Sequence, residues 1–325
     1  MKDLGPVVPI VTPCSLDGSL DVSGFRSVCN DMLDAGCKGI FVAGTTGRGP
    51  WFSLDERVKL CNTAADEIQA RVGNGAKGSI PLMAGVTSSG LPGMLENARA
   101  MEDAGAEIAV ATVPTYFHYN QTEIETIYSK FAEASPLPVI IYDIPEFTNV
   151  KLANDMVLRL AQRGNVVGFK DSSADLERFK GLVESLRSFP EFYLMQGKEN
   201  LIAESLKIGA SGFIVSLMHI DPRPFIGIYH AVRAGNDQLA QALQLEINKV
   251  IKLVKESIDQ RPESSTLYHM LNFCLQKRGV CQNVLLGHDD AAPAWVIENA
   301  QKTIEICSAA AALIQPETGN LITEA

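Results

Sequence analysis

The stretch Val166-Val167-Gly168-Phe169-Lys170-Asp171-Ser172-Ser173 joins a short β-branched and aromatic run to an abrupt polar end. Such a run favours a buried strand, and the small polar residues after it favour a turn. The pattern predicts a strand whose carboxyl end presents the amine of Lys170. Twenty-eight residues earlier, Val139-Ile140-Ile141-Tyr142-Asp143-Ile144-Pro145 repeats the arrangement with the phenol of Tyr142 in place of the amine.

An amine and a phenol over one pocket suggest Schiff-base chemistry on a small carbonyl compound. A lysine attacks a carbonyl only when it is neutral, and its ordinary pKa leaves it charged near pH 7. Burial among Val, Ile and Phe would lower the pKa of Lys170 enough for this chemistry. The alternative for a single lysine at a strand end is a side chain that reaches out to water.

Apolar runs of strand length recur along the whole chain, and segments with helical periodicity lie between them. The helical segments include Gln121–Ala134 and Leu176–Leu186. Strand followed by helix, eight times, predicts an α/β fold, namely a (β/α)8 TIM barrel. The eight predicted strands are Val7–Val11, Gly39–Ala43, Ile80–Val86, Ile108–Val113, Val139–Ile144, Val166–Lys170, Phe192–Met195 and Gly212–Ser216.

Local signals mark the ends of several predicted helices. Ser53-Leu54-Asp55-Glu56 is close to a capping box, which begins a helix. Gly36, Gly105 and Gly209 follow helical segments and lead into strands, as left-handed glycine caps do.

The domain organisation expected from these patterns is a catalytic barrel over residues 1–235 followed by a C-terminal helical appendage over residues 236–314. The polar tail at residues 315–325 is expected to be frayed. The appendage is predicted to hold three helices, which are Asp237–Ile258, Ser264–Arg278 and Ala292–Leu313.

Composition excludes several classes of function. A formal net charge of −10 argues against a nucleic-acid partner. No apolar run approaches the roughly 20 residues of a membrane span, so we expect a cytoplasmic protein without a membrane partner. The seven cysteines form no CxxC pair and read as buried reduced thiols, and the five histidines lack metal-ligand spacing, so no metal is expected.

The loop after the second predicted strand reads Ala43-Gly44-Thr45-Thr46-Gly47-Arg48-Gly49-Pro50. Its glycines permit sharp turns, and two adjacent hydroxyls accompany free amide groups. Such a nest binds an oxyanion, here a carboxylate. A plain Gly/Thr loop is the alternative, but the loop follows an inward strand in a chain that also offers Tyr142 and Lys170 at equivalent places.

Together, Gly44-Thr45-Thr46-Gly47, Tyr142 in a YxxP setting and Lys170 in GFKDSS resemble the dihydrodipicolinate synthase and N-acetylneuraminate lyase family of class I aldolases. The resemblance covers nearly the whole chain. It implies that Lys170 forms a Schiff base with pyruvate or another 2-oxo acid, that Thr45 and Thr46 hold the carboxylate, and that Tyr142 shuttles protons. The lysine is then the electron sink, so no cofactor is expected.

The resemblance assigns further residues to the site. Tyr116 matches a tyrosine that family members lend across a dimer interface, which implies a homodimer or homotetramer. Its alternative role is an aromatic that packs under a loop. Gly47, the backbone of Ile214 and the hydroxyl of Ser216 are expected at the same mouth. Glu199 matches a position that contacts substrate hydroxyls in sugar-acid lyases, although charge pairing at a helix N-terminus explains it equally well.

The substrate is argued from departures from the family pattern. Phe147 stands about where dihydrodipicolinate synthases carry an arginine for the aldehyde's carboxylate, so an aldehyde rich in hydroxyls and without a terminal carboxylate is expected. Thr115 replaces the tyrosine common at the lysine-feedback site. Gly47-Arg48-Gly49-Pro50 resembles the GxGP of 2-keto-3-deoxygluconate-type aldolases. The leading hypothesis is a lyase that releases pyruvate from a 2-keto-3-deoxy sugar acid, or the reverse condensation.

Several alternatives stay open at this point. Other reactions of the same family are those of 4-hydroxy-tetrahydrodipicolinate synthase, N-acetylneuraminate lyase and a keto-deoxy sugar acid dehydratase. A non-catalytic 2-oxo acid binding protein is a different class of function, but a mere binder needs neither Lys170 nor Tyr142. Arg48 either reaches an acidic substrate or pairs with Asp55 or Glu56 on the surface.

Overall fold

The computed structural model describes residues 2–73, 79–262 and 265–314. The chain forms two compact units. The barrel unit comprises Met1–Ile10 and Lys38–Val215, and the helical unit comprises Val11–Cys37 and Ser216–Ala325. The boundaries expected at residues 235 and 314 stay a prediction.

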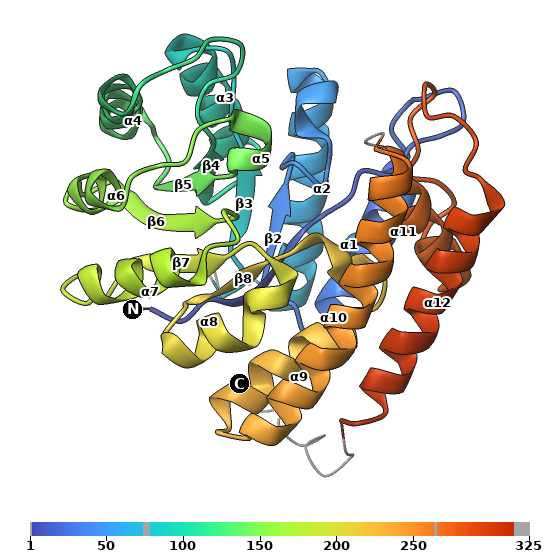
Figure 1. Ribbon diagram of the computed structural model, residues 1–325. Coiled ribbons are helices and arrows are strands. Elements are labelled where there is room, and N and C mark those ends of the chain that lie inside the picture. Colours follow the sequence, from blue (N-terminus) through green and yellow to red (C-terminus); the bar gives the residue numbers. More distant parts are fainter. Residues whose placement is uncertain (1, 74–78, 263–264, 315–325) are drawn as a thin grey trace. The chain divides into compact units, whose positions relative to one another are not determined.

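Eight parallel strands close into a barrel in sequence order, which confirms the predicted TIM barrel (Figure 1). Most ends differ from the predicted ones by one or two residues, in most cases because the predicted run extended into buried loop residues. The strands are β1 Gly5–Pro9, β2 Gly39–Val42, β3 Leu82–Gly85, β4 Ile108–Ala111, β5 Val139–Asp143, β6 Val166–Asp171, β7 Tyr193–Gln196 and β8 Gly212–Ile214.

Apolar side chains fill the barrel interior, as expected of strands buried on both faces. The interior cluster includes Val7, Phe41, Met83, Ile140 and Met195, all at most 1% exposed. Tyr142 belongs to the same cluster, at the carboxyl end of β5. The polar groups of the site therefore stand on top of a closely packed apolar core.

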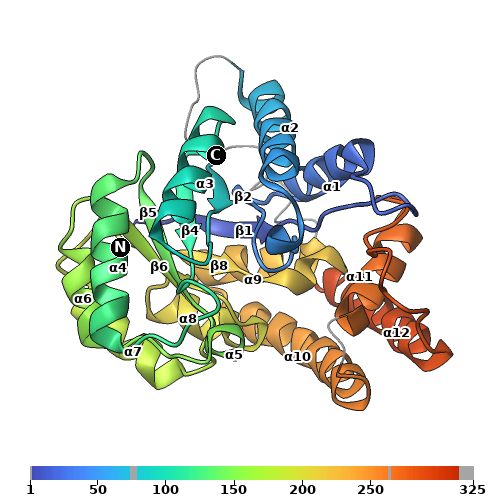
Figure 2. The same cartoon turned by 90° about the horizontal axis from the view of Figure 1, so that it is seen from above.

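The helices of the barrel unit lie around the strands in the view from above (Figure 2). The capping box at the start of α2 is confirmed, since Ser53 and Glu56 exchange both hydrogen bonds. Gly105 and Gly209 adopt the predicted left-handed conformation. The helices are α2 Leu54–Val72, α3 Leu91–Asp103, α4 Gln121–Ala134, α5 Pro145–Thr148, α6 Asn154–Ala161, α7 Leu176–Ser185 and α8 Ile202–Ile208, with 3-10 turns η1 Gly49–Trp51 and η2 Glu199–Leu201.

The helical unit contains the predicted C-terminal helices with small shifts at their ends. Arg278 directly follows α11, and its Nη2 lies 2.6 Å from Asp31 Oδ1 of α1. This ion pair links the end of α11 to α1. Ser264 and the tail at 315–325 fall outside the described residues. The elements are α1 Val22–Asp34, η3 Ser216–His219, α9 Pro222–Arg233, α10 Asp237–Gln260, α11 Ser265–Lys277 and α12 Ala294–Ala311.

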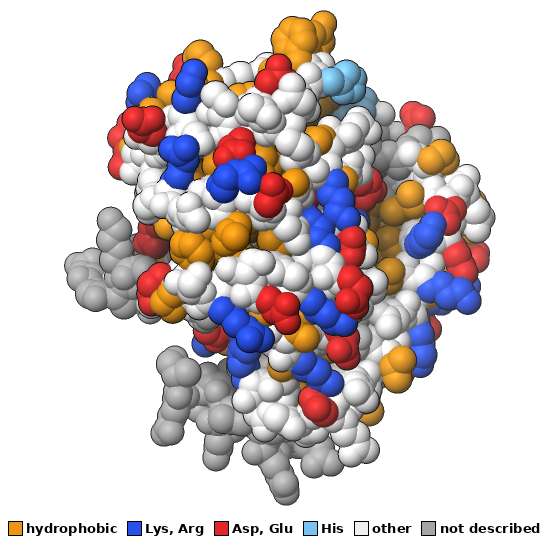
Figure 3. Space-filling view, turned by 60° about the vertical axis from the view of Figure 1, so that its left-hand side comes forward, with side chains coloured by type: hydrophobic (Ala, Val, Ile, Leu, Met, Phe, Trp, Pro, Cys, Tyr) orange, Lys and Arg blue, Asp and Glu red, His pale blue; other side chains and the backbone are white. Residues whose placement is uncertain are grey.

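All seven cysteines are buried free thiols, as predicted. In the part of the chain that the structure describes, no helix combines the length and the apolar character that crossing a membrane requires. On the face in Figure 3, acidic and basic side chains are intermingled.

Candidate active site

The amine and the phenol predicted to share a pocket do so. Tyr142 and Lys170 are register partners on adjacent strands β5 and β6, so both side chains point to the barrel interior. Lys170 Nζ lies 3.8 Å from the centre of the Tyr142 ring and 5.4 Å from that of Phe41. Lys170 is 3% exposed and Tyr142 4%. The two groups are therefore held together in a nearly dry environment.

Burial changes the charge of the lysine. It disfavours the ammonium and lowers the pKa of Lys170 to about 7; the carboxylate of Glu199 acts in the opposite direction, and the ammonium of Lys198 lowers the pKa further. A large share of the amine is then neutral near pH 7. A neutral amine has the free electron pair that attack on a carbonyl carbon requires.

The phenol of Tyr142 is linked to the threonine loop. Burial raises its pKa, while hydrogen bonds with the side chains of Ser172 and Thr45 lower it. Thr45 thus connects the phenol to the Gly44–Gly47 loop. The chain of hydroxyls gives a proton a path between the pocket and this loop.

The loop after β2 is shaped by a strained residue and by glycines that accommodate it. Ala43 has φ +53°, a left-handed conformation that alanine rarely adopts. Its carbonyl oxygen occupies the space that a Cβ of Gly49 or Gly85 would need. The turn is closed by Gly49 N, which donates to Gly44 O at 3.0 Å. Strain of this kind persists only where the surroundings fix it, as they do at binding sites.

Glycine is also required beside the lysine. A Cβ on Gly197 would overlap the Ser172 hydroxyl and lie 3.2 Å from Lys170 Cε. Gly197 follows β7, the strand that pairs with β6, and its amide donates to Asp171 O at 2.8 Å. The sequence analysis did not single out Gly197, because one glycine after a strand carries no specific signal.

A pocket of about 210 Å³ opens beside the phenol, lined by Thr45, Tyr142, Phe147 and other residues of the barrel unit. Phe147 sits in the short helix α5 and is 64% exposed. The aromatic ring thus occupies part of the pocket wall, and α5 brings no cation there.

The other predicted site residues of the barrel unit lie in three places. Thr46 is half-buried and Gly47 is buried in the loop after β2, and Ile214 is buried at the end of β8. Glu199 begins η2, and its charge acts on Lys170. Tyr116 is 87% exposed with φ +89°. This exposure does not fit the alternative of an aromatic packed under a loop. Ser216 begins η3 and belongs to the helical unit, whereas the other predicted site residues belong to the barrel unit.

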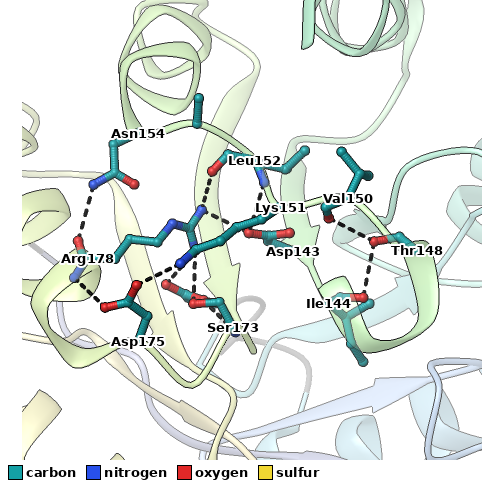
Figure 4. A network of polar contacts seen from close by, with 12 residues as sticks. Asp143, Ile144, Thr148, Val150, Lys151, Leu152, Asn154, Ser173, Asp175 and Arg178 are labelled. Atoms are coloured by element: carbon teal, nitrogen blue, oxygen red, sulfur yellow. Dashed lines mark hydrogen bonds and ion pairs between the residues drawn. The ribbon is translucent and has the colours of Figure 1, made fainter. Parts of the chain in front are cut away.

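The residues that follow the reactive pair form a buried ionic cluster, which the sequence analysis missed. Asp143 and Asp171 are register partners, one position after Tyr142 and Lys170, and therefore point away from the barrel interior. Arg178 of α7 lies between them, with Nη1 2.8 Å from Asp171 Oδ2. Its Nη2 lies 2.8 Å from Asp143 Oδ2, a contact that can be followed in Figure 4. All three side chains are at most 7% exposed.

The cluster is completed by backbone groups. Arg178 Nη2 donates to Leu152 O at 2.6 Å, and Leu152 N donates to Asp143 Oδ2 at 3.3 Å (Figure 4). Burial raises the pKa of Asp143 to about 6; Arg178 acts in the opposite direction, and Asp171 raises it further. One guanidinium therefore does not fully compensate two buried carboxylates. The cluster ties the ends of β5 and β6 to α7.

A closed parallel barrel that carries a buried lysine of lowered pKa beside a phenol at its carboxyl end has the architecture of a class I aldolase. The comparison with known families agrees. The chain belongs to the dihydrodipicolinate synthetase family, whose model matches residues 3–285. It is accordingly a class I aldolase of this family, whose members are pyruvate-dependent lyases and synthases, as the resemblance implied.

Individual relatives show how far the likeness extends. A 4-hydroxy-tetrahydrodipicolinate synthase from Azoarcus sp. (strain BH72) is 33% identical over 246 residues, which are 75% of this chain and 80% of that protein. The structure of the dihydrodipicolinate synthase from Acinetobacter baumannii, complexed with pyruvate, has a TM-score of 0.80 at 26% identity and covers 93% of this chain and 99% of that one.

The fold alone is shared with CdNal from Clostridium difficile, solved in complex with mannosamine. Its TM-score is 0.81 at 21% identity, covering 94% of this chain and 99% of that one.

Proposed function

We propose that this protein cleaves a 2-keto-3-deoxy sugar acid to pyruvate and an aldehyde, or catalyses the reverse condensation, through a Schiff base on Lys170. The observation that carries the proposal is the buried amine with a pKa of about 7, 3.8 Å from the Tyr142 ring. The imine itself withdraws electrons, so the proposed reaction uses neither an organic cofactor nor a metal.

The steps follow from this pair. The neutral amine of Lys170 attacks the C2 carbonyl of the substrate, and loss of water gives a protonated imine. This imine accepts the electron pair of the C3–C4 bond and becomes an enamine, while the C4 hydroxyl gives its proton to Tyr142 and the aldehyde departs. Tyr142 passes its own proton along its hydrogen bond with Thr45. Protonation of the enamine at C3 and hydrolysis then release pyruvate.

The loop after β2 supplies the proposed carboxylate site. Thr45 and Thr46 contribute hydroxyls, and Gly47 contributes a backbone amide in the tight turn that Ala43 and its glycine neighbours form. Ile214, at the end of β8, would complete this side with its backbone. Glu199, close enough to raise the pKa of Lys170, would accept hydrogen bonds from the hydroxyls of the sugar acid.

Tyr116 is proposed to act in a neighbouring copy of the chain. An exposed tyrosine in a left-handed conformation is held away from its own unit, with Phe117 stacked edge-on at 4.9 Å between ring centres. In a homodimer, or a homotetramer built from dimers, it would extend the proton path of the partner's Tyr142. A dissociated subunit would then lose activity while keeping its fold.

A second candidate reaction is that of 4-hydroxy-tetrahydrodipicolinate synthase, in which pyruvate condenses with aspartate semialdehyde. It is favoured by the names of the curated relatives, such as the protein from Azoarcus sp.. Phe147 takes the place of the arginine expected in such enzymes, so α5 supplies no cation for the carboxylate of aspartate semialdehyde.

The test is the mass of the intact protein after borohydride reduction with pyruvate. A permanent adduct that is absent in Lys170→Ala establishes the Schiff base at Lys170, with circular dichroism of the variant as the control for folding. Release of pyruvate from one of a panel of 2-keto-3-deoxy sugar acids then names the cleavage reaction. Consumption of pyruvate with aspartate semialdehyde alone would favour the second candidate, and an adduct that survives in Lys170→Ala would overturn the assignment.

A further inference from the structure

The pocket beside Tyr142 has a cationic end that the proposed reaction leaves without a role. Arg57 of α2 lines the same pocket as Thr45 and Tyr142, together with Thr87 and Thr112. Arg57 is only half-buried, so its guanidinium stays hydrated on one side. The pocket therefore leads from the proton-transfer groups to a positive charge within the barrel unit.

The side chain of Arg57 is held in place by a buried amide. Arg57 Nη2 donates to Asn97 Oδ1 at 3.1 Å, and Arg57 Nε to Ser53 O at 3.4 Å. Asn97 is 6% exposed in α3, and its Nδ2 donates to Val86 O at 3.2 Å. This second bond fixes which end of the amide faces Arg57. Asn97 is thus anchored to the backbone after β3 and in turn fixes the position of the Arg57 guanidinium.

The guanidinium is not neutralised by a carboxylate within the described ranges. Arg178 contacts two carboxylates, and Arg278 contacts Asp31. Arg57, by contrast, has one amide and one carbonyl oxygen as its acceptors among the described residues. Nη1 and one hydrogen of Nη2 remain for another partner, and these two groups form an edge of the fork that a carboxylate fits.

The hydroxyl of Thr87 lines the same pocket. Thr87 Oγ1 accepts from Thr112 N at 2.9 Å and lies 3.2 Å from Thr112 Oγ1, whose single hydrogen goes either to Thr87 Oγ1 or to Val113 O at 3.1 Å. When Thr112 donates to Thr87, the hydrogen of the Thr87 hydroxyl is left to donate to a ligand. A hydroxyl donor and a guanidinium edge on one pocket wall are what an anion needs in a partly dry site.

We infer that Arg57 and Thr87 bind a carboxylate at the far end of the substrate, so that the sugar acid cleaved at Lys170 is a dicarboxylic 2-keto-3-deoxy acid. This inference rests on the proposed function and replaces the expectation, drawn from Phe147, of an aldehyde without a terminal acid. The cation that α5 does not supply comes from α2 instead.

The experiment measures whether Lys170 forms its adduct preferentially with 2-oxo acids that carry a second carboxylate at the far end. The protein is equilibrated with equal concentrations of 2-oxoadipate and 2-oxohexanoate, which have the same chain length and differ in the terminal carboxylate. Borohydride then fixes both imines, and intact mass gives the ratio of the two adducts. A second pair, 2-oxoglutarate and 2-oxopentanoate, tests a shorter reach.

The wild-type protein is expected to favour the diacid in at least one pair by tenfold or more. Arg57→Gln should reduce the ratio by roughly ten- to a hundredfold, because a charge-assisted contact is lost. Arg57→Lys should restore part of it, and Thr87→Val should reduce it a few-fold. Lys59→Gln is the matched control, since it removes an exposed positive charge from the same helix and should leave the ratio within twofold.

Pyruvate adduct formation by each variant separates the two proposals. The inference is wrong, while the Schiff-base function stands, if pyruvate forms an adduct and wild type shows no preference between diacid and monoacid. The same holds if Arg57→Gln leaves the preference for the diacid intact. If Arg57→Gln lowers all adducts equally, Arg57 has only a structural role and the inference falls as well. If wild type forms no adduct with pyruvate, the proposed function fails and the inference fails with it.

Discussion

The carboxyl ends of β5 and β6 carry two pairs of residues that are adjacent in sequence but differ in how the protein treats their charge. One pair points into the barrel and is called the inward row, and the other points away from it and is called the outward row. The inward row, Tyr142 and Lys170, holds an amine whose pKa burial lowers, so the site removes charge. The outward row, Asp143 and Asp171, holds two carboxylates around one guanidinium, so the site keeps charge at similar burial. The difference is the counter-ion that α7 supplies on one face only.

This comparison separates a chemical from a mechanical role on the same two strands. A nucleophile needs a group that readily loses its proton, and a dry environment without a close carboxylate partner provides it. Holding the strand ends in register needs directional contacts, which Arg178 provides through two carboxylates and the carbonyl of Leu152. The outward row therefore fixes the distance between the phenol and the amine.

Arg178→Met gives the largest expected effect on stability. It leaves two buried carboxylates without their counter-ion, which costs about 3–5 kcal/mol of the free energy of unfolding at pH 8. The loss should shrink at acidic pH, because Asp143, whose pKa burial raises to about 6, is then largely protonated. Urea denaturation at pH 5 and pH 8 measures both. Loss of the ionic cluster should also displace Tyr142 and Lys170 relative to each other. We therefore expect slower trapping of pyruvate under conditions where the variant remains folded.

A matched control for this substitution is available on the surface. Arg159 also contacts two carboxylates, Glu125 and Asp155, but its side chain is 49% exposed. Arg159→Met should cost at most about 1 kcal/mol, because exposed ion pairs contribute little. Equal losses for Arg159→Met and Arg178→Met would contradict the view that burial makes the outward row mechanically important.

The inward row could be predicted from the sequence and the outward row could not. The alternation of strand side chains places Tyr142 and Lys170 on one face, and both follow apolar runs, so two local signals agree. Asp143 and Asp171 resemble ordinary turn residues, and their partner lies in a helix seven positions after the second of them. A signal was present, since an acidic residue follows the reactive residue on both strands.

The barrel and most of its helix ends followed from periodicity and capping residues, which are local properties. The pairing of Arg57 with Asn97 joins residues forty positions apart and depends on how two helices meet, so no local pattern reveals it. The strained Ala43 was missed for a related reason. Alanine itself carries no preference for a left-handed turn, and the need for glycine at Gly85 appears only when the strands are side by side.

Lys170→Met should stabilise the protein. The variant tests whether the buried amine of the inward row lowers the free energy of unfolding in order to be reactive. The folded state lowers the pKa of Lys170 to about 7, so below that pH the fold must hold a buried ammonium. The variant removes this cost, and we expect a gain of about 1–4 kcal/mol at pH 6. The gain should decline as the pH rises from 7 toward 10.5, where the unfolded chain also loses the proton.

Thermal unfolding of both proteins from pH 6 to pH 10 gives the comparison. Lys180→Met, which alters an exposed lysine in α7, should show no such pH-dependent gain. A Lys170→Met variant that is less stable than wild type at pH 6 would mean that the amine makes stabilising contacts rather than being held at a cost.

Asp143→Asn tests the outward row by its pH dependence. Asp143 has a pKa of about 6 in the folded state against 3.8 ordinarily, so between these values the folded state holds more protons than the unfolded chain. The free energy of unfolding of wild type should therefore fall as pH rises from about 4 to 6, by at most about 3 kcal/mol from this group. In Asp143→Asn this fall should be absent.

Denaturant titrations at pH 4, 5, 6 and 8 measure the slope. Asp155→Asn serves as the control, because Arg159 lowers the pKa of Asp155 and its titration lies below this window. If Asp143→Asn keeps the wild-type slope, another carboxyl of the cluster carries the proton.

The smallest expected effect concerns two charges that act on Lys170 in opposite directions. Glu199 raises the pKa of Lys170 and Lys198 lowers it. Glu199→Gln should therefore move the pH midpoint of pyruvate trapping to a lower value, and Lys198→Gln should move it to a higher one. Each variant is the control for the other, since both change one charge at neighbouring positions before α8. Shifts in the same direction would show that a change in the loop, rather than the electrostatic field at the amine, governs the reactivity of Lys170.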